Sequence, residues 1–127
     1  MNSAGIYIHI PFCQYICNYC DYFTTEKKAG NIPHFVIMLL REIELTAGNF
    51  DHHDWRIDSI YLGGGSPALL LPKDLENILN KLRGHFPFSQ FPEMTLEINP
   101  GENSFEDLKL FKEMGINRLS IGFQSLN

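Results

Sequence analysis

The sequence predicts an α/β fold in which four strands alternate with three helices, in the order βαβαβαβ. Short segments with alternating apolar residues are separated by longer segments whose apolar residues repeat at helical spacing. Strands joined by helical crossovers lie parallel, with right-handed connections. The 127 residues, of which 44% are hydrophobic and 20% charged, are typical of one globular domain. We therefore expect a parallel sheet around a single hydrophobic core.

The first half of the chain predicts two strands with a helix between them. In the first strand, Gly5–Ile10, isoleucine alternates with other residues, and Pro11 ends the strand. A helix is expected to begin near Pro33, since proline suits a first turn, and to end at Gly48. Its apolar face consists of Val36, Leu39, Leu40 and Ile43. After a polar loop, Asp58–Leu62 forms the second strand and leads into three glycines.

The second half continues the alternation. A helix is expected from about Pro72, with its apolar face formed by Leu75, Ile78, Leu79 and Leu82. The third strand is Met94–Asn99 and the fourth is Arg118–Gly122. Between them, Ser104 caps a short helix in a pattern similar to a capping box with Asp107, and Gly115 ends it.

Each predicted strand has one aliphatic face and one polar face. The aliphatic positions are Ile6, Ile8 and Ile10; Ile60 and Leu62; Leu96 and Ile98; and Leu119 and Ile121. We expect these to pack against the helices. The opposite face carries Glu97, which is costly to bury without a partner. The polar faces would then line a ligand-bearing cavity in a wide barrel or half-barrel, or form the solvated face of a half-sandwich.

The three cysteines, Cys13, Cys17 and Cys20, form a C-x3-C-x2-C pattern. An odd number of cysteines without a signal peptide argues against disulfides. Three close thiolates suit an iron–sulfur cluster with one iron open to a small ligand. A zinc site is an alternative. Structural zinc needs four protein ligands, so His9, His52 or His53 would have to complete the three cysteines. A redox pair of Cys17 and Cys20 is another, although it leaves Cys13 unexplained.

Charge and hydropathy exclude some partners. The formal net charge is −5, so the basic surface needed to bind nucleic acid or anionic membranes is missing. No segment is apolar for the roughly 18 residues that a membrane span requires, and no signal peptide is present. The sequence therefore predicts a cytoplasmic protein.

The segments with chemical character all follow strands. The cysteines follow the first strand, Gly63–Gly65 the second, and Asn99-Pro100-Gly101 the third. Ligands of parallel α/β folds bind at the carboxyl ends of the strands. Glycines there let the backbone approach a ligand closely. We expect the site at this edge of the sheet.

Several motifs resemble those of the radical SAM superfamily. The cysteine pattern, with an aromatic residue before its last cysteine, is similar to the cluster motif, and Gly63-Gly64-Gly65-Ser66-Pro67 to the S-adenosylmethionine amino-group motif. IYIHIPFC, IYLGGGSP, LEINPG and NRLSIGFQS resemble the branch that contains the heme chaperone HemW and oxygen-independent coproporphyrinogen III oxidase. The resemblance implies that residues 1–127 form the N-terminal portion of a partial (β/α) barrel, ending after its fourth strand.

This resemblance implies a set of site residues. Cys13, Cys17 and Cys20 would hold a [4Fe–4S] cluster whose fourth iron chelates S-adenosylmethionine, and an electron from the cluster would cleave that ligand to methionine and a 5′-deoxyadenosyl radical. Gly64 and Gly65, with Ser66 in the same motif, would meet the amino group. The other implied ligand contacts are Tyr7 near the sulfonium, Tyr19 and Tyr22 by adenine, Glu97 at the ribose hydroxyls, and Gln124.

The residues after the last cysteine distinguish between the heme chaperone and the oxidase within this branch of the superfamily. The oxidase has another cysteine two residues later, whereas this chain has Cys20-Asp21-Tyr22-Phe23, which resembles HemW. The resemblance therefore implies a heme chaperone that acts in heme trafficking or porphyrin metabolism, with heme or a porphyrinogen and heme-accepting proteins as partners. Oxidative decarboxylation of coproporphyrinogen III to protoporphyrinogen IX is the alternative. A non-enzymatic zinc-binding domain is the second alternative.

Overall fold

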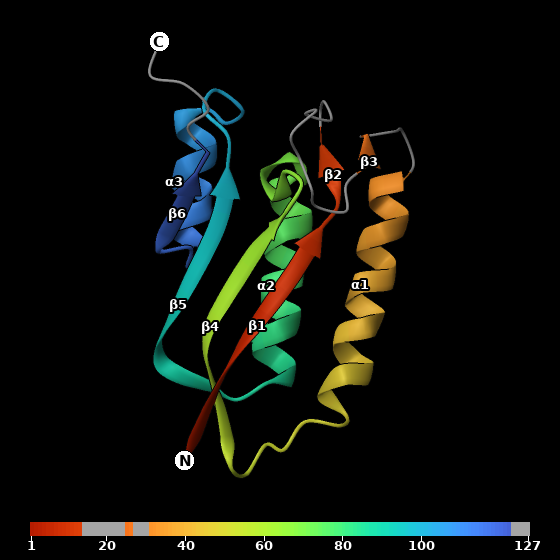
Figure 1. The fold of residues 1–127 in the computed structure, drawn as a ribbon, viewed down its shortest axis with the longest axis vertical. Coiled ribbons are helices and arrows are strands. Elements are labelled where there is room, and N and C mark those ends of the chain that lie inside the picture. The colour runs from red at the N-terminus through yellow and green to blue at the C-terminus, as the bar shows by residue number, and fades with distance from the viewer. Residues whose placement is uncertain (14–24, 27–30, 123–127) are drawn as a thin grey trace.

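The computed structural model describes residues 1–13, 25–26 and 31–122. Four parallel strands form the main sheet in the order β1-β4-β5-β6, and β2 and β3 form a separate parallel pair beyond the carboxyl end of β1 (Figure 1). The predicted parallel α/β fold is therefore confirmed. The elements are β1 (Asn2–Ile10), β2 (Phe12–Cys13), β3 (Thr25–Glu26), α1 (Asn31–Ala47), β4 (Trp55–Gly64), the 3₁₀ helix η1 (Pro67–Leu69), α2 (Pro72–His85), β5 (Phe88–Ile98), α3 (Phe105–Glu113) and β6 (Arg118–Ile121).

The strands β1, β4 and β5 are longer than the alternation of their side chains predicts. β4 continues through Gly64, which pairs with Ile10 on β1. The strand β5 begins at Phe88, which pairs with Ile57, and the register shifts between Ile57 and Ser59. A register shift interrupts the period-2 pattern, so the amino end of β5 could not be located from that pattern. The β2–β3 pair and η1 were not predicted either.

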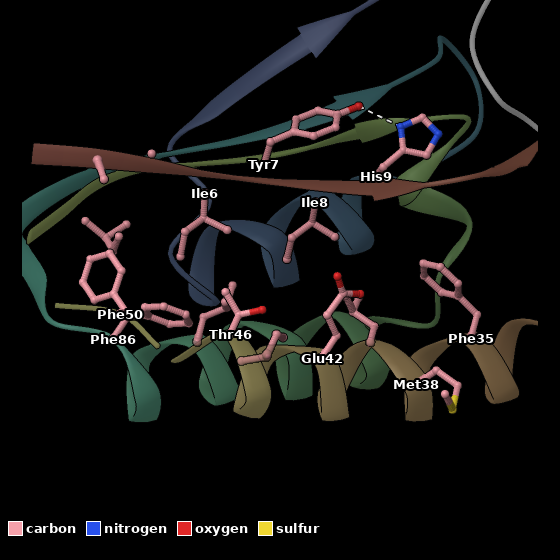
Figure 2. A pocket seen from close by; sticks show the side chains of 16 residues that line it. Ile6, Tyr7, Ile8, His9, Phe35, Met38, Glu42, Thr46, Phe50 and Phe86 are labelled. Carbon is pink, nitrogen blue, oxygen red and sulfur yellow. Dashed lines mark hydrogen bonds between the residues drawn. The ribbon is translucent and has the colours of Figure 1, made fainter. Parts of the chain in front are cut away.

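The hydrophobic core lies between the sheet and the helices. Figure 2 shows Ile6 and Ile8 pointing from β1 toward the helices, and Tyr7 and His9 on the opposite side of the strand. Ile8 is 5% exposed and Ile10 is fully buried. The predicted apolar face of α2 is buried at all four positions, namely Leu75, Ile78, Leu79 and Leu82. Removal of this apolar surface from water stabilises the sheet that carries the site.

The prediction that β6 packs its aliphatic face against the helices was wrong. Leu119 is 39% exposed and Ile121 is 44% exposed. The buried apolar side chains in this part of the fold are Phe111, which lies within α3, and Ile116, which follows α3. A pocket of about 540 Å³ remains beside Leu119. Within the described ranges 1–13, 25–26 and 31–122, no further strand pairs with the outer edge of β6.

The short helix α3 begins with the predicted capping box. The hydroxyl of Ser104 accepts a hydrogen bond from the backbone N–H of Asp107 at 3.1 Å, and the Asp107 carboxylate accepts one from the N–H of Ser104 at 2.9 Å. Two of the N–H groups that a helix leaves unpaired are thereby satisfied. The cap fixes the end of the loop that connects β5 to α3. None of the described helices combines the length and apolar character that crossing a membrane requires.

Candidate functional site

The glycine loop that follows β4 is hydrogen-bonded to the segment that leads to Cys13. The N–H of Gly65 donates to the carbonyl oxygen of Ile10 at 2.7 Å, and the N–H of Ser66 donates to that of Phe12 at 2.6 Å. These bonds continue the β1–β4 pairing past the last residue of β1. The backbone around Cys13 and the glycine loop are therefore held side by side at the carboxyl edge of the sheet.

Gly65 lies directly against Cys13. A Cβ atom at Gly65 would lie 2.4 Å from the carbonyl oxygen of Phe12 and 2.9 Å from Sγ of Cys13. Both distances are too short for real contacts, so only glycine allows this approach. The half-buried Cys13 side chain thus adjoins backbone that carries no side chain. This arrangement would allow a ligand of a cluster bound to the Cys13 thiol to contact the Gly65 backbone as well.

Gly64 has a positive φ of 114°, which favours glycine. A Cβ atom there would lie 2.8 Å from the Ile10 carbonyl oxygen and 3.0 Å from the ring of His9. Its N–H donates to Oε2 of Glu97 at 3.3 Å. Because the N–H groups of Gly64, Gly65 and Ser66 all donate within the protein, the loop would meet an ammonium group through its carbonyl oxygens.

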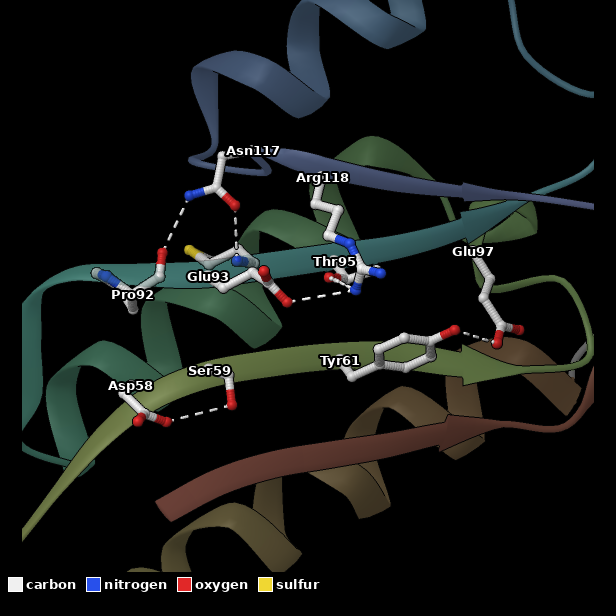
Figure 3. A network of polar contacts seen from close by, with 10 residues as sticks. Asp58, Ser59, Tyr61, Pro92, Glu93, Thr95, Glu97, Asn117 and Arg118 are labelled. Atoms are coloured by element: carbon white, nitrogen blue, oxygen red, sulfur yellow. Dashed lines mark hydrogen bonds and ion pairs between the residues drawn. The ribbon is translucent and has the colours of Figure 1, made fainter. Parts of the chain in front are cut away.

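The Glu97 carboxylate on β5 receives hydrogen bonds from two parts of β4. Oε1 accepts from the hydroxyl of Tyr61 at 2.7 Å (Figure 3). Oε2 accepts from the N–H of Gly64 at 3.3 Å. The side chain is half-buried. A carboxylate offers about four acceptor positions, so each oxygen retains capacity for a further donor such as a sugar hydroxyl.

Tyr7 lies on the same face of the sheet as Glu97, on β1, which is separated from β5 by β4. Its side chain is 55% exposed, and its hydroxyl oxygen is 2.9 Å from Nδ1 of His9 (Figure 2). The rings of Tyr7 and Tyr61 are stacked, with centroids 5.9 Å apart. An exposed aromatic ring at the edge of a polar face is suited to contact a bound organic ligand.

The sequence did not predict a cluster of polar side chains that is hydrogen-bonded to Ser66 at the end of the glycine loop. Ser66, only 3% exposed, donates to Oε1 of Glu102 at 3.1 Å and accepts from the side-chain amide of Asn99 at 3.0 Å. Asn99 also donates to both oxygens of Glu102. The cluster joins the loop after β4 to the loop after β5. The signal available in the sequence was a carboxylate placed directly after the Asn-Pro-Gly turn.

The amino half of the polar face carries charged side chains farther from the loops. Arg118 on β6 donates to Glu93 at 3.3 Å and lies 3.4 Å from the hydroxyl of Thr95 (Figure 3). Thr95 is 1% exposed although it belongs to the face predicted to be polar. The face is therefore polar along its length but not uniformly open.

Some predicted residues fall outside the described part of the chain. These are the two later cysteines and three of the implied ligand contacts: Cys17, Cys20, Tyr19, Tyr22 and Gln124. The structure brings together Cys13, Gly64, Gly65 and Glu97. No group of three metal-ligating side chains occurs among the described residues, which include only one of the three cysteines.

The histidines considered for a zinc site lie in two different places. His52 and His53 precede β4, at the amino end of the sheet, and His52 contacts the carbonyl oxygen of Ala47 at 2.9 Å. Cys13 lies at the opposite end. His9, in contrast, lies close to Gly64 and therefore near the cysteine segment. A zinc site formed by His52 or His53 with Cys13 does not fit this fold.

A family comparison agrees with the geometry at the carboxyl edge. The model of the radical SAM superfamily matches residues 7–127, which include β1, the glycine loop and Glu97. The chain belongs to the radical SAM superfamily. Members of this superfamily bind S-adenosylmethionine and a [4Fe–4S] cluster. The contact of Gly65 with Cys13 and the hydrogen bond from Gly64 to Glu97 fit that pair of groups.

Individual relatives of this radical SAM chain carry names related to heme and porphyrins. The heme chaperone HemW of Lactococcus lactis is 35% identical over 99% of this chain and 31% of its own length. Anaerobilin synthase of Escherichia coli O157:H7 is 34% identical over 96% of this chain and 27% of its own. The structure of coproporphyrinogen III oxidase (HemN) from E. coli superposes with a TM-score of 0.89 at 28% identity, over 99% of this chain and 29% of that one. This chain thus spans about a third of the length of the relatives that it matches.

Proposed function

We propose that the protein is a heme chaperone that acts in heme trafficking in the cytoplasm, and that it binds a [4Fe–4S] cluster and S-adenosylmethionine. Cys13, Cys17 and Cys20 would hold the cluster. Once bound and reduced, the cluster would supply the electron that cleaves the sulfonium of S-adenosylmethionine. The chain's own residues bind and orient that ligand.

The observation that carries the cofactor part of the proposal is the contact between Gly65 and Cys13. The thiol and the glycine backbone adjoin each other, so a cluster on the thiol and an amino acid moiety on the loop would also be neighbours. Glu97, tied to Gly64, would accept hydrogen bonds from the ribose hydroxyls. Tyr7, exposed on the same face, would contact the ligand near the sulfonium.

The remaining proposed contacts are assigned from sequence. Tyr19 and Tyr22 would lie by the adenine, and Gln124 would contact the same ligand. Ser66 would act through its backbone position in the glycine loop, since its hydroxyl already bonds Glu102 and Asn99. We further propose that residues 1–127 are the N-terminal portion of a radical SAM core domain.

Two observations favour the chaperone over the oxidase. The last cysteine is followed by Asp21 and two aromatic residues, without the additional cysteine of the oxidase pattern. The chain is also 35% identical to the heme chaperone HemW of L. lactis. The TM-score of 0.89 with HemN keeps coproporphyrinogen III oxidation as the second candidate function.

A comparison of heme binding with porphyrinogen turnover tests this proposal. The full-length protein, reconstituted anaerobically with iron and sulfide, is titrated with heme and followed by absorbance. In parallel, the reduced protein is incubated with S-adenosylmethionine and coproporphyrinogen III. We expect stable heme binding and no protoporphyrinogen IX.

The opposite pattern would identify the second candidate. Formation of protoporphyrinogen IX without stable heme binding would establish the oxidase and overturn the chaperone. Formation of anaerobilin would place the protein with the anaerobilin synthase relative instead. Zinc in place of iron and sulfide would refute both functions.

A further inference from the structure

Tyr61 contacts side chains from all three other strands of the main sheet. Its ring stacks on Tyr7 of β1, with an interplanar angle of 29°. Its hydroxyl donates to Glu97 of β5 at 2.7 Å, as Figure 3 shows, and lies near Ser120 of β6. The side chain is half-buried. Tyr61 therefore has a fixed ring and a fixed hydroxyl direction.

The surroundings of Tyr61 keep its hydroxyl protonated. Burial, and then the hydrogen bond and negative charge of Glu97, raise the pKa of Tyr61, against the lowering effects of Ser120 and Arg118. A phenol whose pKa lies above its ordinary value of 10.0 is a hydrogen-bond donor at neutral pH. The hydroxyl can therefore donate to the Glu97 carboxylate throughout the physiological range.

Glu97 depends on this donor for its orientation. Its other donor among the described residues, the N–H of Gly64, is farther away, at 3.3 Å from Oε2. A glutamate side chain has several rotatable bonds, and one longer hydrogen bond restricts them weakly. The 2.7 Å bond from Tyr61 to Oε1 holds the second oxygen, so the two bonds together fix the carboxylate plane.

We propose that Tyr61 is a positioning residue, which holds the Glu97 carboxylate so that its remaining lone pairs can accept the ribose hydroxyls of S-adenosylmethionine. This inference rests on the proposed function, because it requires Glu97 to bind the ribose. It adds a residue that touches no ligand itself. The aromatic ring alone would serve packing against Tyr7, and phenylalanine would preserve that packing.

The test uses the Tyr61→Phe variant of the full-length, cluster-containing protein and two ligands. Equilibrium binding is measured for S-adenosylmethionine and for its analogue that lacks both ribose hydroxyls. Loss of a hydrogen bond that orients a charged group is expected to weaken S-adenosylmethionine binding by about tenfold. Binding of the analogue should not change. Ser59→Ala is the matched control, because Ser59 lies two residues earlier on the same face and its hydroxyl donates to Asp58 instead.

A double substitution separates positioning from a general structural role. In a Glu97→Gln background, Tyr61→Phe should weaken S-adenosylmethionine binding little further, because the carboxylate that it orients is gone. Equal weakening of both ligands by Tyr61→Phe, or no weakening of either, would overturn the inference. Undiminished binding by Glu97→Gln would also overturn it, together with the ribose contact assigned to Glu97, while leaving the proposed binding of the cluster and of S-adenosylmethionine intact. A wild-type protein with a full cluster and no affinity for S-adenosylmethionine would instead refute the proposed function itself.

Discussion

Replacing Gly65 with alanine is expected to weaken S-adenosylmethionine binding by roughly 30-fold, because overpacking costs about 1–3 kcal/mol and each 1.4 kcal/mol is tenfold in affinity. The added Cβ would meet the Phe12 carbonyl oxygen at 2.4 Å and the Cys13 sulfur at 2.9 Å. The loop would have to move, which would stretch its hydrogen bonds to Ile10 and Phe12. Gly65 is not among the glycines with positive φ, so the cost arises from lack of space.

Gly84→Ala is the matched control for this substitution. Gly84 lies in α2, and a Cβ there would have nothing within 4 Å. Alanine in a helix is more favourable than glycine by about 0.5–1 kcal/mol, so this variant should be at least as stable as the wild type. Its affinity for S-adenosylmethionine should not change. If Gly65→Ala binds the ligand as tightly as Gly84→Ala does, the glycine loop does not contact S-adenosylmethionine as proposed.

Replacing Cys13 with alanine is expected to remove nearly all iron and sulfide from the reconstituted full-length protein. Iron–sulfur clusters are held by cysteine thiolates, and this motif offers only three, so the loss of one leaves two. Iron and sulfide are measured chemically after reconstitution. Cys13 is half-buried at the end of β2, and alanine removes only its sulfur. The circular dichroism spectrum should therefore stay close to that of the wild type.

His53→Ala provides the control for metal binding. His53 precedes β4 at the far end of the sheet and is exposed, so its loss should leave the iron content unchanged. A fall in metal content in His53→Ala, with none in Cys13→Ala, would contradict the assignment of the cysteines. Such a result would favour a histidine-containing metal site.

Periodicity predicted the faces of the sheet well and the contacts between side chains poorly. Ile8, Leu62 and Leu96 are buried as their alternation indicates, since the period of a strand decides which face a residue joins. Periodicity does not say which polar neighbours meet across strands. The bond from Tyr61 to Glu97 joins residues 36 apart in sequence, so it becomes apparent only in the fold.

In the loops, likewise, the motifs could be predicted from the sequence but their contacts could not. The glycine motif could be located in the sequence, but its contact with Cys13 depends on how Gly65 and Ser66 bond to the segment after β1. Glu102 has no periodic signal, because it lies in a turn and acts through Ser66 and Asn99. The exposure of Leu119 was missed for a different reason. An aliphatic strand face indicates that another part of the protein covers it, but it does not identify which helix or strand does so.

Electron paramagnetic resonance of the reduced full-length protein, with and without S-adenosylmethionine, tests most directly whether this edge of the sheet joins a cluster to its ligand. The protein should contain about four iron and four sulfide per chain, as a [4Fe–4S] cluster requires. Addition of S-adenosylmethionine should change the spectrum of the cluster, and Gly65→Ala should require more ligand for the same change. A cluster spectrum that does not respond to S-adenosylmethionine, or a protein that binds zinc without iron and sulfide, would contradict the account.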